Sequence, residues 1–333
     1  MAMEIVSKYN YLVIDSVNLA YKLFQHKSES PTQIGNKQIY KKSVCNFINF
    51  VEDLKSKCLL SDGEIFLLFD NYFSKADLKS MFMYSDRKKL DEAYKSNRSK
   101  DNKEFYNSLN FLRYYYLIAP STYHTVRIDN LEADDLVEPV LNYCNVFKDN
   151  TKRALLVTSD MDWTRYLNTN VDWLPDLSKS PETLSDMSNR YGFPITKKNV
   201  ILYKALFGDK SDNIDNIAVL NEQNFNSFLE LIKVVSDLDD IIYMSRDEET
   251  CEKYPVLKEL HKKDKKRKYE NREAMYRINI QLISSIPCSL DSLKCHLTTG
   301  RNAKSLFKTV REAIGLENHH EFVFGNVKRS RLQ

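Results

Sequence analysis

Three short apolar runs in this sequence end in aspartate, a residue type that can hold a metal ion or move a proton. The runs read YLVID, IFLLFD and LLVTSDMD, and they supply Asp15, Asp70, Asp160 and Asp162. Each run is rich in Val, Ile, Leu and Phe without strict alternation, as buried parallel strands are. Because the carboxyl ends of parallel strands meet at one edge of an open sheet, we expect these acids to converge there.

A fourth run, YHTVRID, leads into the segment LEADDLV, which carries three more acids. Glu132, Asp134 and Asp135 would occupy the first turn of a helix. Carboxylates are tolerated in that position, because the helix dipole and the free backbone N–H groups favour negative charge. The sequence therefore predicts a second group of acids beside the strand ends.

Taken singly, these acids have ordinary structural explanations. A lone Asp after a strand is usually a turn or helix N-cap residue, and an EADD cluster can be a capped helix start. Taken together at one sheet edge, they would repel one another strongly unless cations were present. Oxygen donors without His or Cys select Mg²⁺ or Mn²⁺ rather than zinc. Two such ions can hold a phosphodiester, lower the pKa of a bound water and stabilise the leaving oxygen, so phosphodiester hydrolysis is the predicted reaction.

The elements that must position these acids alternate between strands and helices. Strands are expected at 11–14, 64–69, 123–128, 154–158 and 171–174, and helices at 43–57 and 105–116. This alternation predicts an α/β fold with a central, mainly parallel twisted sheet flanked by helices. From about residue 194 the pattern is mainly helical, with candidate helices at 200–207 and 225–235. We therefore expect an α/β core over residues 1–193 and a helical region over residues 194–333.

A basic segment interrupts the core between two of the expected strands, at about residues 71–105. Its cations are interleaved with Phe73, Phe82, Tyr84 and Tyr94, and they are Lys75, Lys79, Arg87, Lys88, Lys89, Lys95, Arg98, Lys100 and Lys103. Taken alone, such a run is usually a solvated basic helix. Its position directly after Asp70 favours a role beside the acids instead.

Composition sets broader limits. The 333 residues are 42% hydrophobic and 29% charged, with a net charge of +3, so any basic surface must be local. The six cysteines include no CxxC pair and no zinc-like cluster with His, which indicates reduced thiols and predicts a cytoplasmic protein. No apolar run approaches the roughly 20 residues of a membrane-spanning helix, and no export signal is visible. We expect a soluble monomer.

Six motifs occur in an order that resembles the 5′-to-3′ exonuclease and flap endonuclease family, especially its bacteriophage members. They are IDSVNLAY at 14–21, the Asp at 70, YKSNR at 94–98, LEADDL at 131–136, TSDMDW at 158–163 and GDKSDNI at 208–214. Each motif is weak alone, but six in order are specific. They span about residues 11–215, and the resemblance implies a PIN-like 5′ nuclease core.

The resemblance implies two metal positions. One would be surrounded by Asp15, Asp70, Glu132 and Asp134, the other by Asp160, Asp162, Asp209 and Asp212, with Asp135 at or between them. Two Mg²⁺ ions are the implied cofactors, and Mn²⁺ is expected to substitute.

The resemblance also gives the basic segment a role, as a helical arch over the active site. Lys95 and Arg98 match the residues that face the scissile phosphate, where positive charge would stabilise the developing negative charge. Tyr94 could stack on an unpaired base. Backbone contacts to nucleic acid are expected from Lys75, Lys79, Arg87, Lys88 and Lys89.

Two departures from the family pattern affect these expectations. Ser16 follows Asp15 where the family usually has Gly, and Ser tolerates tight turns. After GDKSDNI the sequence reads DNIAVLNEQNFNSFLELI, without the glycines of the family's duplex-binding hairpin, so the helix-hairpin-helix is expected to be degenerate. The basic run Lys258–Lys268 is either a compensating duplex contact or a solvated loop. Residues 271–287 resemble the segment with which some phage members rejoin the main domain.

The resulting function prediction is a structure-selective 5′ nuclease that acts on DNA with 5′ ends or flaps. RNA in RNA/DNA hybrids, as in primer removal during phage replication, is a further predicted substrate, and replication proteins are predicted partners. One alternative is a less selective 5′-to-3′ exonuclease on double-stranded DNA. An alternative of another class is a catalytically inactive nucleic-acid-binding protein, and a PIN-type ribonuclease would be shorter and lack the arch.

Overall fold

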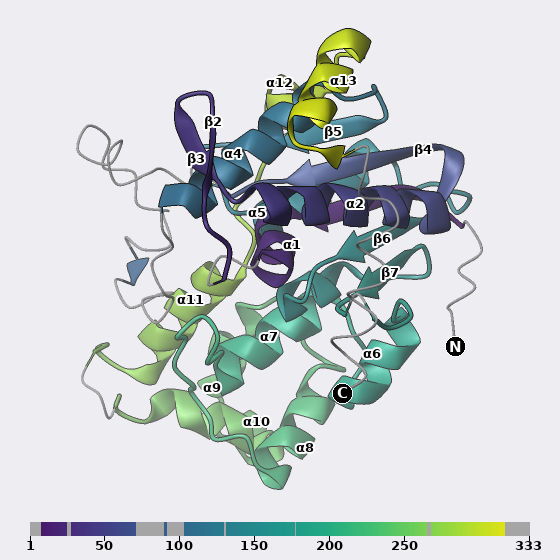
Figure 1. Cartoon of the computed structure of the whole chain (residues 1–333). Coiled ribbons are helices and arrows are strands. Elements are labelled where there is room, and N and C mark those ends of the chain that lie inside the picture. The colour runs from purple at the N-terminus through teal and green to yellow at the C-terminus, as the bar shows by residue number, and fades with distance from the viewer. Residues whose placement is uncertain are drawn as a thin grey trace.

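A six-stranded sheet forms the centre of the chain, in the order β7-β6-β1-β4-β5-β8 (Figure 1). The first five strands in this order pair in parallel, and β8 pairs with β5 in the antiparallel sense. The computed structural model describes residues 8–24, 28–70, 90–91, 103–129, 131–176, 178–264 and 268–316. The predicted α/β fold with a mainly parallel sheet is confirmed.

The strands have the following bounds. They are β1 (Tyr9–Asp15), β2 (Thr32–Ile34), β3 (Lys37–Ile39), β4 (Leu59–Leu68), β5 (Tyr123–Val126), β6 (Ala154–Val157), β7 (Val171–Leu174) and β8 (Leu297–Thr299). The α-helices are α1 (Ser16–Leu23), α2 (Lys41–Cys58), α4 (Lys103–Ile118), α5 (Ala133–Tyr143), α6 (Leu184–Tyr191), α7 (Lys197–Phe207), α8 (Glu222–Leu231), α9 (Asp240–Ser245), α10 (Glu248–Lys253), α11 (Arg272–Ile283), α12 (Leu290–His296) and α13 (Lys304–Ala313). Two 3-10 helices are η2 (Met161–Tyr166) and η3 (Pro255–His261).

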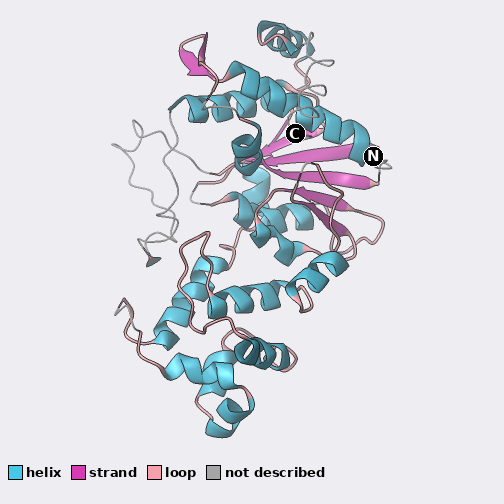
Figure 2. Ribbon diagram, turned by 60° about the horizontal axis from the view of Figure 1, so that its bottom comes forward, coloured by secondary structure: helices cyan, strands magenta, loops and turns pink. Residues whose placement is uncertain are grey.

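The central strands are apolar on both sides because helices cover both faces of the sheet (Figure 2). In β1, Leu12 and Ile14 point into one core and Val13 into the other. Leu12 is in register with Ile65 of β4 and with Leu155 of β6. All five of these side chains are fully buried, which explains the continuous apolar runs in the sequence.

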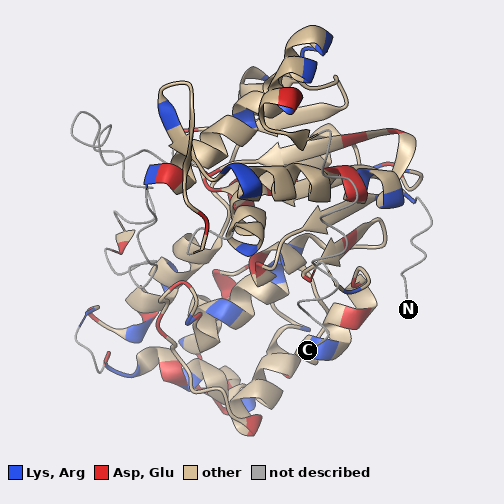
Figure 3. Cartoon of the chain, viewed as in Figure 1, with Lys and Arg blue, Asp and Glu red and all other residues tan. Residues whose placement is uncertain are grey.

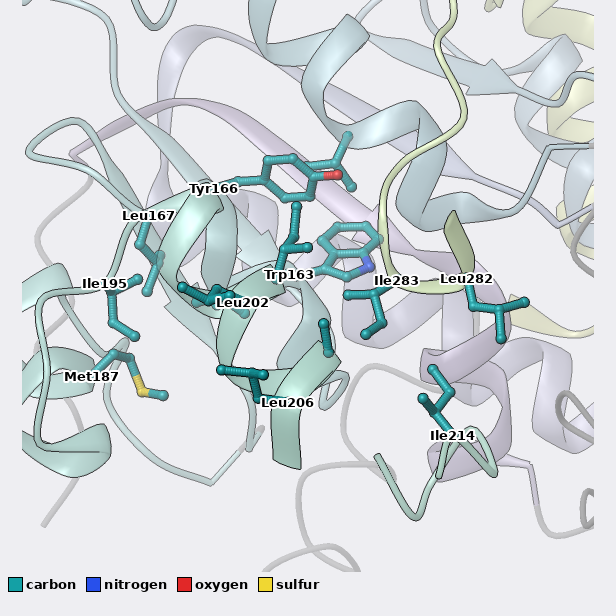
Figure 4. Close-up of a cluster of buried hydrophobic side chains, with 14 of the residues drawn as sticks. Trp163, Tyr166, Leu167, Met187, Ile195, Leu202, Leu206, Ile214, Leu282 and Ile283 are labelled. Atoms are coloured by element: carbon teal, nitrogen blue, oxygen red, sulfur yellow. The ribbon is translucent and has the colours of Figure 1, made fainter. Parts of the chain in front are cut away.

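One core contains apolar residues of α1, α2 and α4, and the other contains residues of α5, η2, α7 and α11. The second core continues into α8 and η3, so the helical region shares it with the sheet. Trp163, fully buried, lies in this core near Leu202, Leu206 and Ile283 (Figure 4). It therefore anchors η2 between the sheet and the helices beyond it.

The C-terminal part of the chain returns from the helical region to the sheet. After α11, helix α12 packs against α5, β8 pairs with β5, and α13 packs against α4. Gly300, directly after β8, lies so close to the carbonyls of Ala119 and Pro120 that a Cβ there would be 2.5 Å and 2.3 Å from their oxygens. Residues 290–316 therefore pack against elements of the α/β core. The division of the chain at residue 193 stays a proposal.

The segment expected to form the arch, residues 71–105, lies mostly outside the described residues. Its described parts are Leu90 and Asp91 and the first turn of α4. Oδ2 of Asp91 accepts hydrogen bonds from Lys268 Nζ at 2.5 Å and Tyr269 Oη at 2.9 Å. Asp91 therefore contacts the chain just before α11.

No helix among the described residues combines the length and the apolar character needed to cross a membrane. All six cysteines are described and none forms a disulfide. Acidic and basic residues are interspersed over the ribbon rather than separated into two halves (Figure 3).

Candidate active site

Asp15 lies at the junction of β1 and α1, with no loop between the two elements. Its Oδ1 accepts a hydrogen bond from the backbone N–H of Asn18 at 2.9 Å, so Asp15 is the N-cap of α1. Its Oδ2 accepts from Thr158 Oγ1 at 3.2 Å, at the end of the neighbouring strand β6. The N-cap interpretation of this acid is correct, and the same side chain also faces the adjacent strand end.

Asp70 lies two residues beyond the end of β4, and its carboxylate reaches the start of α5. Its Oδ1 accepts from the backbone N–H of Ala133 at 2.6 Å. Burial raises the pKa of Asp15 well above its ordinary value. Three neighbouring carboxylates raise it further, those of Asp70, Asp134 and Asp160. The strand-end acids and the first turn of α5 therefore share one electrostatic environment, as the sequence predicts.

A chain of hydrogen bonds continues from Asp15 to the two acids of the TSDMDW motif. Thr158 Oγ1 accepts from the backbone N–H of Asp160 at 3.0 Å while it donates to Asp15. Oδ1 of Asp160 then accepts from the backbone N–H of Asp162 at 2.9 Å, which caps η2. Thr158 therefore fixes the two strand-end acids relative to each other.

Lys204 of α7 lies between two of the predicted metal ligands. Its Nζ donates to Asp162 Oδ1, and to Asp209 Oδ2 at 2.6 Å. The lysine is 8% exposed, so this ammonium is a buried positive charge within the acid cluster. Burial raises the pKa of Asp209, but Lys204 and the donors of Ser211 outweigh it and leave that pKa below its ordinary value.

The GDKSDNI segment forms a tight loop that holds Asp209 and Asp212 at the end of α7. The backbones of Asp209 and Ile214 exchange two hydrogen bonds, at 3.0 Å and 2.8 Å. Gly208 has φ +78°, and a Cβ there would be 2.8 Å from the Ile214 carbonyl oxygen, so the turn requires glycine. Asp212, 5% exposed, is buried in this loop.

Asp135 differs from the other acids because it is fully buried and holds backbone groups with both carboxyl oxygens. Oδ2 accepts from the N–H of Glu132 at 3.0 Å, the reciprocal bond of a capping box. Oδ1 accepts from the N–H of Ile286 at 2.8 Å. This carboxylate joins the start of α5 to the segment that follows α11.

Comparison with known proteins identifies the family. Residues 10–192 match the family described as 5′-3′ exonuclease, N-terminal resolvase-like domain. The chain belongs to this family. A 5′-3′ exonuclease of Mycoplasmopsis pulmonis is 27% identical over 165 residues, 48% of this chain and 53% of that protein. DNA polymerase I of Caldicellulosiruptor bescii is also 27% identical over 165 residues, 46% of this chain and 19% of that protein. The chain thus spans about half the length or less of these relatives.

Solved structures of the bacteriophage T5 enzyme share the fold over nearly the whole chain. The T5 protein co-crystallised with metal ions gives a TM-score of 0.59 at 17% identity, covering 92% of this chain and 99% of that one. The T5 flap endonuclease with DNA and metal ions gives 0.57 at 18% identity, covering 93% and 100%. The likeness therefore extends beyond residues 10–192 into the helical region.

The cluster of this 5′-3′ exonuclease family member includes side chains that the sequence did not indicate. Lys204 and Tyr166 were missed because no motif or spacing marks a lysine or a tyrosine within an apolar element, and Thr158 lies in the TSDMDW motif but was given no role there. Tyr166 Oη donates to the backbone carbonyl of Asp134 at 3.0 Å and lies 2.5 Å from Ser285 Oγ. It therefore fixes the first turn of α5 against η2 and the segment after α11.

None of the residues predicted to contact nucleic acid from an arch lies in the described part of the chain. Tyr94, Lys95 and Arg98 lie outside the described residues. The same holds for the expected backbone contacts Lys75, Lys79, Arg87, Lys88 and Lys89. Their roles stay predictions.

Part of the basic run Lys258–Lys268 is engaged with acids of the chain itself. Lys262 pairs with Glu259 at 2.5 Å, and Lys268 pairs with Asp91. Residues 265–267 lie outside the described part. These ion pairs favour a structural role for Lys262 and Lys268. The duplex contact stays a prediction.

The loop that follows the GDKSDNI segment is closed by asparagine side chains. Asn216 Nδ2 donates to the Ala218 carbonyl at 3.0 Å, and Asn224 Nδ2 donates to the Val219 carbonyl at 2.8 Å. Val219 and Leu220 are 64% and 52% exposed at the tip of the loop. The tip is apolar.

The donor chemistry of the cluster suits a hard divalent cation. Its oxygen donors are carboxylates that follow β1, β4 and β6 or begin α5, and a cation would relieve the repulsion that raises the pKa of Asp15. Within the described residues, no group of three or more His, Cys, Asp or Glu side chains is already arranged to hold a metal ion. The carboxylates are instead held by backbone N–H groups, Thr158 and Lys204, and the metal assignment stays a prediction.

Proposed function

We propose that this chain is a metal-dependent, structure-selective 5′ nuclease that hydrolyses phosphodiester bonds in DNA. The observation that carries the proposal is geometric: Asp15 accepts a hydrogen bond from Thr158 at the end of β6, and Asp70 accepts one from the first residue of α5, so acids from three strand ends and one helix start meet at one sheet edge. Membership of the 5′-3′ exonuclease family supports the same conclusion. So does the T5 flap endonuclease, a protein of the same fold solved with DNA and metal ions.

The first cation would be held by Asp15, Asp70, Glu132 and Asp134, with Asp135 at or between the two positions. The second would be held by Asp160, Asp162, Asp209 and Asp212, where Lys204 now supplies positive charge to Asp162 and Asp209. When bound, such ions lower the pKa of water and stabilise negative charge on the leaving oxygen. Mg²⁺ is the proposed ion and Mn²⁺ a substitute, since all the donors are oxygens.

The residues of the chain then have separate tasks around the scissile phosphate. Thr158 holds Asp15 and Asp160 at a fixed separation, and Asp135 and Tyr166 fix the first turn of α5. Positioning of this kind matters because misplacement of reacting groups by about 1 Å can cost on the order of 100-fold in rate. From the arch, Lys95 and Arg98 would stabilise charge that develops on the phosphate.

A panel of substrates tests the proposal. Wild-type protein would be incubated with a 5′-flap, a nicked duplex, a blunt duplex and an RNA/DNA hybrid, with Mg²⁺ or with EDTA. We expect Mg²⁺-dependent cleavage near the junction of the flap, and slower cleavage of the blunt duplex. Equal rates on all duplexes would favour the less selective exonuclease instead.

A catalytically inactive nucleic-acid-binding protein is the alternative from another class. It would bind the flap without cleaving it under any divalent metal. The chain argues against it, because all nine predicted acidic ligands are present in the sequence and the seven strand-end and α5 acids lie near the same sheet edge. Lys95→Ala should lower the rate of the chemical step by on the order of 100-fold, whereas a change in KM alone would show that Lys95 only binds.

A further inference from the structure

A hollow lies beside Asp70, on the side away from Asp160. It is open to solvent and is lined by Val17, Phe69, Asp70, Tyr106, Arg113 and Arg127, among others. The lining thus includes Asp70, a predicted metal ligand, and two arginines, Arg113 and Arg127, that lie outside the family motifs of the sequence. The acids and the arginines are neighbours in space.

The order of the strands explains this arrangement. Along the sheet, the strands β6, β1, β4 and β5 are consecutive, and they lead into Asp160, Asp15, Asp70 and Arg127 respectively. Neighbouring strands lie about 4.8 Å apart. The charge at the sheet edge therefore changes from negative to positive within about one strand spacing beyond Asp70.

The two arginines repel each other. Burial lowers the pKa of Arg127 and the charge of Arg113 lowers it further, whereas the charge of Asp129 raises it. Nε of Arg113, on α4, is buried, and among the described residues it has no hydrogen-bond partner. A half-buried pair of like charges with an unused N–H donor is the arrangement that an anion would stabilise.

We propose that Arg113 and Arg127 bind a phosphate group of the substrate strand, next to the phosphodiester that is cleaved, on the Asp70 side of the acids. Guanidinium groups match phosphate oxygens in a two-pronged geometry. The group is either a terminal 5′-phosphate or an internal phosphodiester, since both present the same anionic oxygens. The proposal rests on the proposed nuclease function, and it adds a specificity-determining subsite outside the metal ligands and the arch.

A chemical double-mutant cycle tests this subsite. Wild-type protein and the Arg113→Gln/Arg127→Gln variant would cleave flap substrates in which a single linkage is replaced by a neutral methylphosphonate, scanned over the positions that flank the cut. We expect one position at which the neutral linkage slows the wild-type protein by roughly 10- to 100-fold and has no further effect on the variant. A second pair of substrates, with a 5′-phosphate or a 5′-hydroxyl on a blunt duplex, assigns the effect to a terminal or an internal phosphate.

The Arg301→Gln/Lys304→Gln variant is the matched control, because both residues are exposed after β8, at the opposite edge of the sheet, and the change in net charge is the same. It should respond to the neutral linkage as the wild type does. If no single neutral linkage and no loss of the 5′-phosphate distinguishes the wild type from the double variant, the subsite does not exist. Absence of any cleavage by the wild-type protein would instead refute the nuclease function.

Discussion

Buried aspartates at the two edges of the sheet, where its strands begin and where they end, have different partners. At the amino edge, Asp172 of β7 is 2% exposed and its Oδ2 accepts from Tyr9 Oη at 2.7 Å, Arg153 at 2.9 Å and Lys8 at 3.1 Å. At the carboxyl edge, Asp15 of β1 is 6% exposed and accepts only from a backbone N–H and Thr158. No lysine or arginine of the described residues pairs with Asp15.

This difference separates a structural acid from a candidate ligand. Asp172 is neutralised by cations of the chain itself, which is how folded proteins normally accommodate a buried charge. Asp15 faces other carboxylates, which raise its pKa in addition to the effect of burial. An external cation near Asp15 would relieve this repulsion.

The largest expected effect is on the cleavage rate, which should depend on the acids at the carboxyl edge and not on those at the amino edge. Asp160→Asn should lower Mg²⁺-dependent flap cleavage by on the order of 10³-fold or more, because each ligand supports several kcal/mol of transition-state stabilisation. Asp172→Asn should leave the rate within a few-fold of wild type once the protein is folded. Single-turnover rates at saturating enzyme measure both, and equal losses in the two variants would remove the distinction between the edges.

Lys204 pairs with Asp162 and Asp209 as the amino-edge cations pair with Asp172. Its removal should therefore destabilise the metal-free protein. Lys204→Met should lower the free energy of unfolding of the metal-free protein by about 3 kcal/mol, since it leaves Asp162 and Asp209 without their buried partner. Mg²⁺ should restore part of this loss. Denaturant titrations with EDTA and with Mg²⁺ measure it. Lys197→Met, which removes the half-exposed pair with Glu138, is the control and should cost below about 1 kcal/mol.

Neutralising one acid at each edge should change stability in opposite directions. Asp172→Asn should destabilise the protein by about 2 kcal/mol, a moderate value because Lys8 and Arg153 are themselves partly exposed. Asp15→Asn should stabilise the metal-free protein at neutral pH, because the ionised carboxylate is unfavourable there. Thermal unfolding in EDTA compares the two variants, and destabilisation by Asp15→Asn would contradict the assignment.

The pH dependence of this difference follows from the direction of the Asp15 pKa shift. A raised pKa in the folded state gives stability that is present below the unfolded value of about 3.9 and is lost as pH rises through the folded value. The free-energy gap between Asp15→Asn and wild type should therefore widen as pH rises from about 4, in EDTA. Mg²⁺ should narrow it, and a gap independent of pH would show that Asp15 titrates normally.

Much of the fold could be predicted because its strands are buried on both faces. Runs such as Leu12 to Ile14 and Ile65 to Leu68 contain no polar residue, and the acids that end them mark the edge directly. Strand β8 could not be predicted, since its three residues are half-exposed or exposed and pair with β5 from far along the chain. It depends on tertiary contacts rather than on local pattern.

For the site, the sequence indicates which acids meet but not what holds them. The dual role of Asp15 as helix cap and site residue follows from geometry that no spacing reveals. Asp135 belongs to the same LEADDL motif as the neighbouring acids, yet its two oxygens accept hydrogen bonds from the backbone of Glu132 and Ile286. Lys204 and Arg113 are cations within otherwise apolar helix faces, and only the packed structure places them beside the acids.

The central claim is that the acids of the carboxyl edge use a divalent cation to cleave a phosphodiester. Cleavage of an end-labelled 5′-flap substrate, read at nucleotide resolution, tests it most directly in wild type and Asp160→Asn, each with Mg²⁺ and with EDTA. We predict cuts near the flap junction only for the wild type with Mg²⁺, with substrate binding retained in the variant. Equal cleavage by Asp160→Asn, or undiminished cleavage in EDTA, would contradict the claim.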